Sequence, residues 1–124
     1  TFVLSDGYYD TYYEKAQKAR DLMIRDFNHV FENWDLILAP TVPTTAYKIG
    51  EKSSNLLEMY TGHICTVPAS IAGIPALSMP CGMDESMMPV GMQLMGKAFS
   101  EPLIYRAAYA FERQQGGHKY DQRL

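Results

Sequence analysis

The 124-residue sequence lacks the features that mark several large classes of protein. Its apolar runs are far shorter than the ~20 residues needed to cross a membrane, so no transmembrane helix is expected. A formal net charge of −3 leaves no basic surface of the kind that grips a phosphate backbone. Only two cysteines are present, Cys65 and Cys81, too few for a disulfide framework. We expect two reduced, buried thiols in a cytosolic protein.

The N-terminus carries neither a methionine nor a recognisable secretory signal. Residues 1–4 are apolar but have no charged flank and no cleavage site. We expect the chain to be an excised fragment rather than a processed product. Its 47% hydrophobic and 20% charged residues are ordinary for a globular domain and exclude a disordered protein.

Common catalytic and cofactor-binding motifs are also missing. The chain has no G-x-S-x-G elbow, P-loop, Rossmann glycine fingerprint or zinc-ligand spacing. Ser78 follows a strand-like run without the sharp turn that a nucleophilic serine needs. His63 and Cys65 would point to different faces of a helix, so a catalytic Cys–His pair is not expected. His63 alone precedes an expected proline kink and is either a pocket residue or an ordinary surface or internally bonded histidine.

What the sequence does contain is an alternation of helical and strand-like segments, typical of an α/β fold. The spacing predicts about three helices and three short strands. The expected helices span residues 8–31, 55–64 and 100–115, and the expected strands span 35–40, 76–80 and 90–95. The strand at 35–40 is expected to be buried on both faces.

Local signals set the expected ends of these elements. Asn33 is predicted to stop the first helix in a left-handed conformation, and Asn55 to Glu58 resembles a capping box. Pro68 is expected either to start a new helical turn or to kink the preceding helix. Gly73 is predicted to end the helical segment that contains Pro68. Ser100 is predicted to cap the final helix, which Gly116-Gly117 ends. Residues 118–124 are expected to fray.

The segment from Ile71 to Gly96 joins glycine-rich turns to apolar runs and carries no evident catalytic group. It is interpreted as scaffold that lines a site whose reactive residues lie elsewhere. Six of the eight methionines lie between Met79 and Met95, either as core filling or as an adaptable binding surface. The tyrosines of the opening could equally pack in the core or form an interface.

Several motifs together resemble a known family. The matching stretches are Ser5-Asp6-Gly7-Tyr8-Tyr9-Asp10-x-Tyr12-Tyr13-x-Lys15-Ala16-Gln17-Lys18-x-Arg20, Asp35-Leu36-Ile37-Leu38-Ala39-Pro40-Thr41-x-Pro43, Ala72-Gly73-x-Pro75, Pro80-Cys81-Gly82 and Pro89-Val90-Gly91-x-Gln93. They resemble the amidase signature family, and the tyrosine-rich opening points to its glutamyl-tRNA(Gln) amidotransferase subgroup. The resemblance covers essentially the whole chain, so residues 1–124 are expected to form the C-terminal part of one amidase-signature α/β/α domain with a mixed sheet.

The resemblance implies a parent enzyme that hydrolyses glutamine and delivers the ammonia to partner subunits. In that family the complex with subunits B and C converts Glu-tRNA(Gln) to Gln-tRNA(Gln) in the cytoplasm, and one of the partners uses ATP and Mg. The family's catalytic serine, bridging serine and lysine would lie upstream of this segment. No catalytic, cofactor or metal residue is therefore expected in the 124 residues, and the segment alone is expected to be inactive.

His63 departs from the family pattern. The amidotransferases of the family usually place at this position an acidic residue that holds the amino group of glutamine. A neutral imidazole cannot supply that negative charge, and a protonated one would repel the ammonium. His63 is thus the one candidate substrate-binding residue, and glutamine as the substrate is in question.

Two rival hypotheses remain beside the glutamine-hydrolysing amidotransferase. One is a stand-alone amidase that acts on a different amide, which the histidine at position 63 favours. The other is a non-catalytic interaction module that uses its tyrosine and methionine surfaces and folds as an independent monomer.

Overall fold

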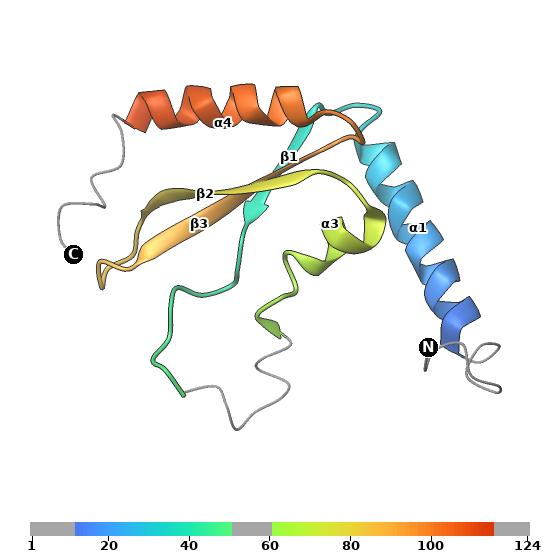
Figure 1. Ribbon diagram of the computed structural model, residues 1–124, viewed down its shortest axis with the longest axis horizontal. Helices are drawn as coiled ribbons and strands as arrows, with labels where there is room; N and C mark the ends of the chain where they lie inside the picture. Colours follow the sequence, from blue (N-terminus) through green and yellow to red (C-terminus); the bar gives the residue numbers. More distant parts are fainter. Residues whose placement is uncertain (1–11, 51–60, 116–124) are drawn as a thin grey trace.

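The computed structural model describes residues 12–50 and 61–115. The chain forms a three-stranded sheet with one long helix lying along it and two further helices beside it (Figure 1). The elements are α1 (Glu14–Val30), β1 (Leu36–Pro40), α3 (Val67–Ala72), β2 (Ala76–Met83), β3 (Pro89–Gly96) and α4 (Glu101–Gln115). The predicted α/β class, with three helices and three strands, is confirmed for these residues.

Helix α1 is amphipathic, as the 3.6-residue spacing of its apolar side chains predicts. Phe27 and Phe31 stack on its apolar side with ring centroids 6.4 Å apart. The predicted stop at Asn33 is wrong in its mechanism, because no positive φ occurs there. The helix ends instead through backbone bonds, with the amide of Trp34 donating to the carbonyl of Val30 at 3.1 Å. Its expected first residues lie outside the described ranges.

The sheet has the order β1-β3-β2, with both pairs antiparallel. A hairpin joins β2 to β3, whereas β1 reaches β3 from a distant part of the sequence. The expectation that β1 is buried on both faces is wrong for the described structure, because Leu38 is 66% exposed. The reason is that Leu38 pairs with Leu94 on the face that α4 covers, but α4 packs on β2 and β3 rather than on β1.

The core lies between α4 and one face of the sheet. Its buried members are Met79, Met92, Leu94, Ile104 and Ala108. The strand methionines therefore serve as core filling, one of the two interpretations of the methionine-rich segment. Met83 at the end of β2 and Met87 and Met88 in the hairpin loop are exposed instead. The opposite face of the sheet turns toward α3, which itself contacts α1 (Figure 1).

The turn before α3 departs from prediction. The predicted end of the helix expected at residues 55–64 is wrong, because residues 62–66 form a turn. Most of that expected helix lies in residues 51–60, outside the described part of the chain. Pro68 falls in the first turn of α3, where its missing N–H is tolerated, so of the two alternatives for this proline the structure shows the new helical turn. Gly73 ends α3 at φ 71°, a left-handed conformation that suits glycine, and this prediction is also confirmed.

Ser100 precedes α4 but does not cap it with its side chain. Its carbonyl accepts the amides of Leu103 at 2.9 Å and Ile104 at 3.2 Å. Its hydroxyl is buried without a hydrogen-bond partner among the described residues, so the predicted side-chain cap is wrong. The hydroxyl lies instead against the backbone of Gly96, where a Cβ would meet it. The predicted stop at Gly116-Gly117 and the tail 118–124 fall outside the described residues.

Candidate functional site

Polar side chains gather on the face of the sheet opposite α4. Side chains alternate along a strand, so Met92 and Leu94 face α4 while Gln93 faces away from it. Ser78 on β2 pairs directly with Gln93, and Thr41 follows the end of β1 with its amide bonded to Gly91 at 3.0 Å. We call Thr41, Ser78 and Gln93 the polar cluster.

Gln93 is the one buried polar residue among those described, at 3% exposure. Its side-chain amide donates to the carbonyl of Pro40 at 3.0 Å and to the carbonyl of Cys65 at 2.6 Å. The two carbonyls belong to segments far apart in sequence, the end of β1 and the turn before α3. Gln93 therefore joins three segments of the chain at one point.

The two hydroxyls of the polar cluster contact each other. Thr41 Oγ1 and Ser78 Oγ lie 2.7 Å apart, and either can donate. Gly91 makes room for them, since a Cβ at that position would come within 3.1 Å of Thr41 Oγ1. Ser78 has no histidine among its hydrogen-bond partners in the described part of the chain, and its hydroxyl contacts another neutral hydroxyl, which cannot serve as a strong general base.

His63 lies in the turn formed by residues 62–66 and is exposed. Its carbonyl accepts the amides of Thr66 at 3.1 Å and Val67 at 3.0 Å, which fixes the backbone of the turn. Within residues 12–50 and 61–115 its imidazole makes no hydrogen bond or ion pair. The turn that carries His63 is the same turn whose Cys65 carbonyl is bound by Gln93.

The two cysteines are free thiols, half-buried rather than buried as expected. Cys81 donates weakly to the carbonyl of Val90 at 3.5 Å. Over the described residues, no three histidine, cysteine or acidic side chains lie close enough to hold a metal ion. The same part of the chain has no helix that is both long and apolar enough to span a membrane.

A cavity of about 310 Å³ opens beside the polar cluster, where β1 ends and β3 begins. Its walls are residues 40 and 42–46 on one side and 89–91 on the other. Asp84 braces this wall: its carboxylate accepts the hydroxyl of Thr45 at 2.7 Å and the amides of Ser86 at 2.8 Å and Met88 at 2.9 Å. Donation from the Met88 amide, then from Thr45 and Ser86, holds the pKa of Asp84 below its ordinary value.

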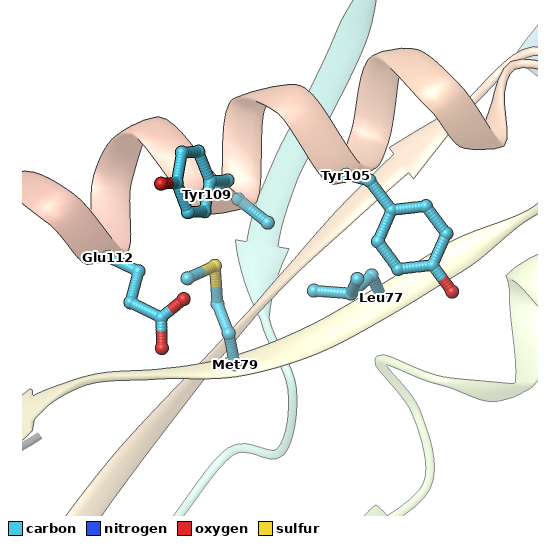
Figure 2. A pocket seen from close by; sticks show the side chains of 6 residues that line it. Leu77, Met79, Tyr105, Tyr109 and Glu112 are labelled. Carbon is cyan, nitrogen blue, oxygen red and sulfur yellow. The ribbon is translucent and has the colours of Figure 1, made fainter. Parts of the chain in front are cut away.

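A second, apolar groove lies on the other face, between α4 and β2. Figure 2 shows Tyr105, Tyr109 and Glu112 from α4 and Leu77 and Met79 from β2 around it. The groove encloses about 380 Å³, and its two tyrosines are 64% and 62% exposed. The sequence prediction considered tyrosines only at the opening of the chain and missed this aromatic surface, although the i, i+4 spacing of Tyr105 and Tyr109 is visible in the sequence.

The sequence prediction singled out His63 but missed its surroundings. In the sequence prediction, Gln93 appears only as a member of the Pro89-Val90-Gly91-x-Gln93 motif, and Thr41 only as the residue that follows an expected strand. A polar residue between Met92 and Leu94 was the available signal, because a buried strand rarely carries an amide without a partner for it.

Comparison with known proteins gives consistent similarities. The amidase family model matches residues 1–104. The chain is 55% identical over 119 residues, 96% of its length, to the A subunit of the glutamyl-tRNA(Gln) amidotransferase of Geobacillus stearothermophilus. It spans 24% of that protein, about a quarter of the length of the curated relatives it matches.

Solved structures agree with the sequence matches. The crystal structure of the corresponding amidotransferase protein from Thermotoga maritima superposes with a TM-score of 0.81 and 42% identity, covering 90% of this chain and 24% of that one. A bacterial aryl acylamidase of the amidase signature family gives a TM-score of 0.63 at 27% identity, covering 78% of this chain and 21% of that one. The resemblance found in the motifs and the predicted amidase-signature fold are both confirmed.

Proposed function

We propose, because the chain belongs to the amidase family, that it is part of the glutamine-hydrolysing component of a tRNA-dependent amidotransferase. The observation behind this proposal is the 55% identity over 119 residues to a glutamyl-tRNA(Gln) amidotransferase. The parent enzyme releases ammonia from glutamine, and partner subunits B and C use it, with ATP and Mg, to convert Glu-tRNA(Gln) to Gln-tRNA(Gln). We place this complex in the cytoplasm.

The 124 residues contribute to the active site without carrying its nucleophile. A serine nucleophile, a bridging serine and a lysine base are proposed to lie in the part of the parent protein that this chain does not span, and the segment alone is inactive. The polar cluster supports a place at the site, because Thr41 and Ser78 hold two neutral hydroxyls 2.7 Å apart, and the neighbours of Thr41 in the chain, residues 40 and 42, line a cavity of about 310 Å³. Such groups can bind the polar end of an amide substrate.

His63 is proposed to contact the substrate. It is exposed, and it lies in a turn that Gln93 bonds to the sheet beside the polar cluster. Where related amidotransferases usually carry an acid, His63 offers no negative charge to an α-ammonium group. This observation favours a second candidate function, a stand-alone amidase for an amide without a free amino group.

Assays on the full-length parent protein separate the two functions. An amidotransferase component hydrolyses glutamine, with a rate that rises when subunits B and C are added. A stand-alone amidase cleaves neutral amides and is indifferent to those subunits. The sequence of the parent gene adds a direct check, since absence of the two serines and the lysine would sink both enzymatic proposals.

The role of His63 is tested by His63→Asp and His63→Gln in the same protein. Because a carboxylate attracts an α-ammonium group, His63→Asp is expected to lower the KM for glutamine about tenfold, corresponding to about 1.4 kcal/mol, while His63→Gln changes it little. The KM for a neutral amide should not fall in either variant. Equal KM values for glutamine in all three proteins would place His63 outside the substrate site.

A further inference from the structure

Gln93 occupies a position where a polar side chain is costly unless its hydrogen bonds are made. It is 3% exposed in the central strand of the sheet, between the core residues Met92 and Leu94. An unpaired amide buried there would destabilise the fold. Both observed acceptors are carbonyl oxygens, so the nitrogen of the amide, not its oxygen, must face them.

The two acceptors differ in their relation to the sheet, because Pro40 belongs to β1, which already pairs with β3, whereas Cys65 lies outside the described strands. The carbonyl of Pro40 is 53 residues from Gln93 in sequence and marks the end of β1. The carbonyl of Cys65 is 28 residues away, within the 62–66 turn. That second hydrogen bond, at 2.6 Å, joins the turn directly to the central strand.

His63 and Cys65 belong to one hydrogen-bonded turn. The amides of Thr66 and Val67 bind the carbonyl of His63, so the turn is closed around residue 65. A shift of the Cys65 carbonyl would carry the His63 side chain with it. On the sheet side, Gln93 is paired with Ser78, whose hydroxyl contacts Thr41.

We infer that Gln93 is a positioning residue, which sets the place of the 62–66 turn, and with it His63, relative to Thr41 and Ser78. Gln93 itself touches no substrate in this scheme; it acts through the backbone of the turn. The inference rests on the proposed function in so far as His63 contacts the substrate.

The test uses the full-length parent protein with Gln93→Met and Gln93→Glu. Gln93→Met removes both donors while keeping the length of the side chain. Gln93→Glu keeps the shape but, when ionised, turns a negative charge toward two carbonyls. Gln115→Met is the matched control, because Gln115 also donates to a backbone carbonyl, that of Cys81 at 3.1 Å, from the exposed surface of α4.

If Gln93 positions the turn, Gln93→Met raises the KM for the amide substrate about tenfold or more with a smaller effect on kcat, since misplacement of ~1 Å can cost up to about 100-fold. A purely structural loss would reduce the fraction of folded enzyme, and hence kcat, at constant KM. Gln115→Met should change neither constant by more than about twofold, as expected of an exposed surface residue.

The Gln93→Glu variant adds a pH signature. Burial and the two carbonyls raise the pKa of the new carboxyl, and its protonated form can donate one hydrogen bond again. The increase in KM of Gln93→Glu over the wild-type value should therefore become smaller as the pH falls from about 8 to about 5. The increase in KM of Gln93→Met should stay constant over the same range. If Gln93→Glu does not fold, the uncharged Gln93→Met decides the kinetic comparison.

Hydrogen exchange gives a readout that does not need activity. The amides of Thr66 and Val67, which close the turn, should exchange faster in Gln93→Met than in wild type or Gln115→Met. Unchanged exchange at both amides overturns the inference, and so does an unchanged KM in an active enzyme. A parent protein that cleaves no amide, yet shows the faster exchange, overturns the proposed function and leaves the positioning role intact.

Discussion

Asp84 holds the loop between β2 and β3, because its one carboxylate accepts three hydrogen bonds. One of them, from Thr45, crosses to the segment that follows β1 and braces the wall of the 310 Å³ cavity. Met87 in the same loop has φ 63°, so the carboxylate stabilises a turn in which an ordinary side chain adopts a left-handed conformation.

The lowered pKa of Asp84 predicts a dependence of stability on pH. A carboxyl whose pKa is lower in the folded than in the unfolded state stabilises the fold above its unfolded pKa of about 3.9, and this contribution is lost as the pH falls toward the folded pKa. Asp84→Asn should therefore lower the melting temperature of the full-length protein near neutral pH, and the gap from wild type should narrow below about pH 4.

Thermal unfolding between about pH 3 and about pH 7 measures this gap. Glu85→Gln is the matched control, because Glu85 is the neighbouring exposed acid in the same loop. A gap for Asp84→Asn that stays constant across the whole range would contradict the ionic role of Asp84.

Gln93 shows why residue-level features of the site escaped prediction. Its polar character was visible between Met92 and Leu94, but its partners are backbone carbonyls, which carry no signature in the sequence. Ser100 illustrates the opposite error. A serine before a helix is a sound capping signal, yet here the close approach to Gly96 places its hydroxyl in a buried position without a partner among the described residues.

The secondary-structure elements were predicted more accurately than the residues of the candidate site. The period of α1, the proline-started and glycine-ended α3, and the hairpin strands β2 and β3 all depend on local interactions, so pattern and turn chemistry predicted them. The pairing of β1 with β3 depends on segments distant in sequence, and the exposure of Leu38 depends on where α4 packs on the sheet. Neither property is encoded in a local pattern.

The contact between β3 and the start of α4 gives a prediction at this scale. A Cβ at Gly96 would meet the hydroxyl of Ser100 and approach Ile104 to 3.1 Å. Gly96→Ala should therefore push α4 from the sheet and destabilise the protein by about 1–3 kcal/mol, as overpacking of a core does.

Gly82→Ala is the matched control, because nothing lies within 4 Å of its Cβ position and its φ is not positive. Its effect should stay within about 0.5 kcal/mol. Urea unfolding of the full-length variants gives the change in the free energy of unfolding for both substitutions. Equal stability of Gly96→Ala and wild type would contradict the prediction, because α4 could then shift without loss of stability.

The described residues expose large apolar side chains on several elements of the fold. Among them are Leu22, Leu38, Tyr105 and Tyr109. Together with the quarter-length match to its relatives, this surface indicates packing against further protein.

The isolated 124-residue chain is accordingly expected to be unstable. It should bind a hydrophobic dye such as ANS and show broad, fast amide exchange, whereas the full-length protein should do neither. Dye fluorescence and hydrogen exchange on both proteins test this. A protected, two-state monomer of the isolated chain would favour the interaction-module hypothesis, which the amidase similarities otherwise argue against.

The buried amide of Gln93 has a consequence for how the strands find their alignment. Because successive side chains point to opposite faces, a slip of β3 by one residue would turn Gln93 into the apolar layer beneath α4 and move Met92 or Leu94 to the polar face. The misaligned sheet would lose core packing and leave an amide unpaired, at about 1–3 kcal/mol for the amide alone. Gln93 thus discriminates against slips of the central strand by an odd number of residues, a selectivity that an all-apolar strand would lack.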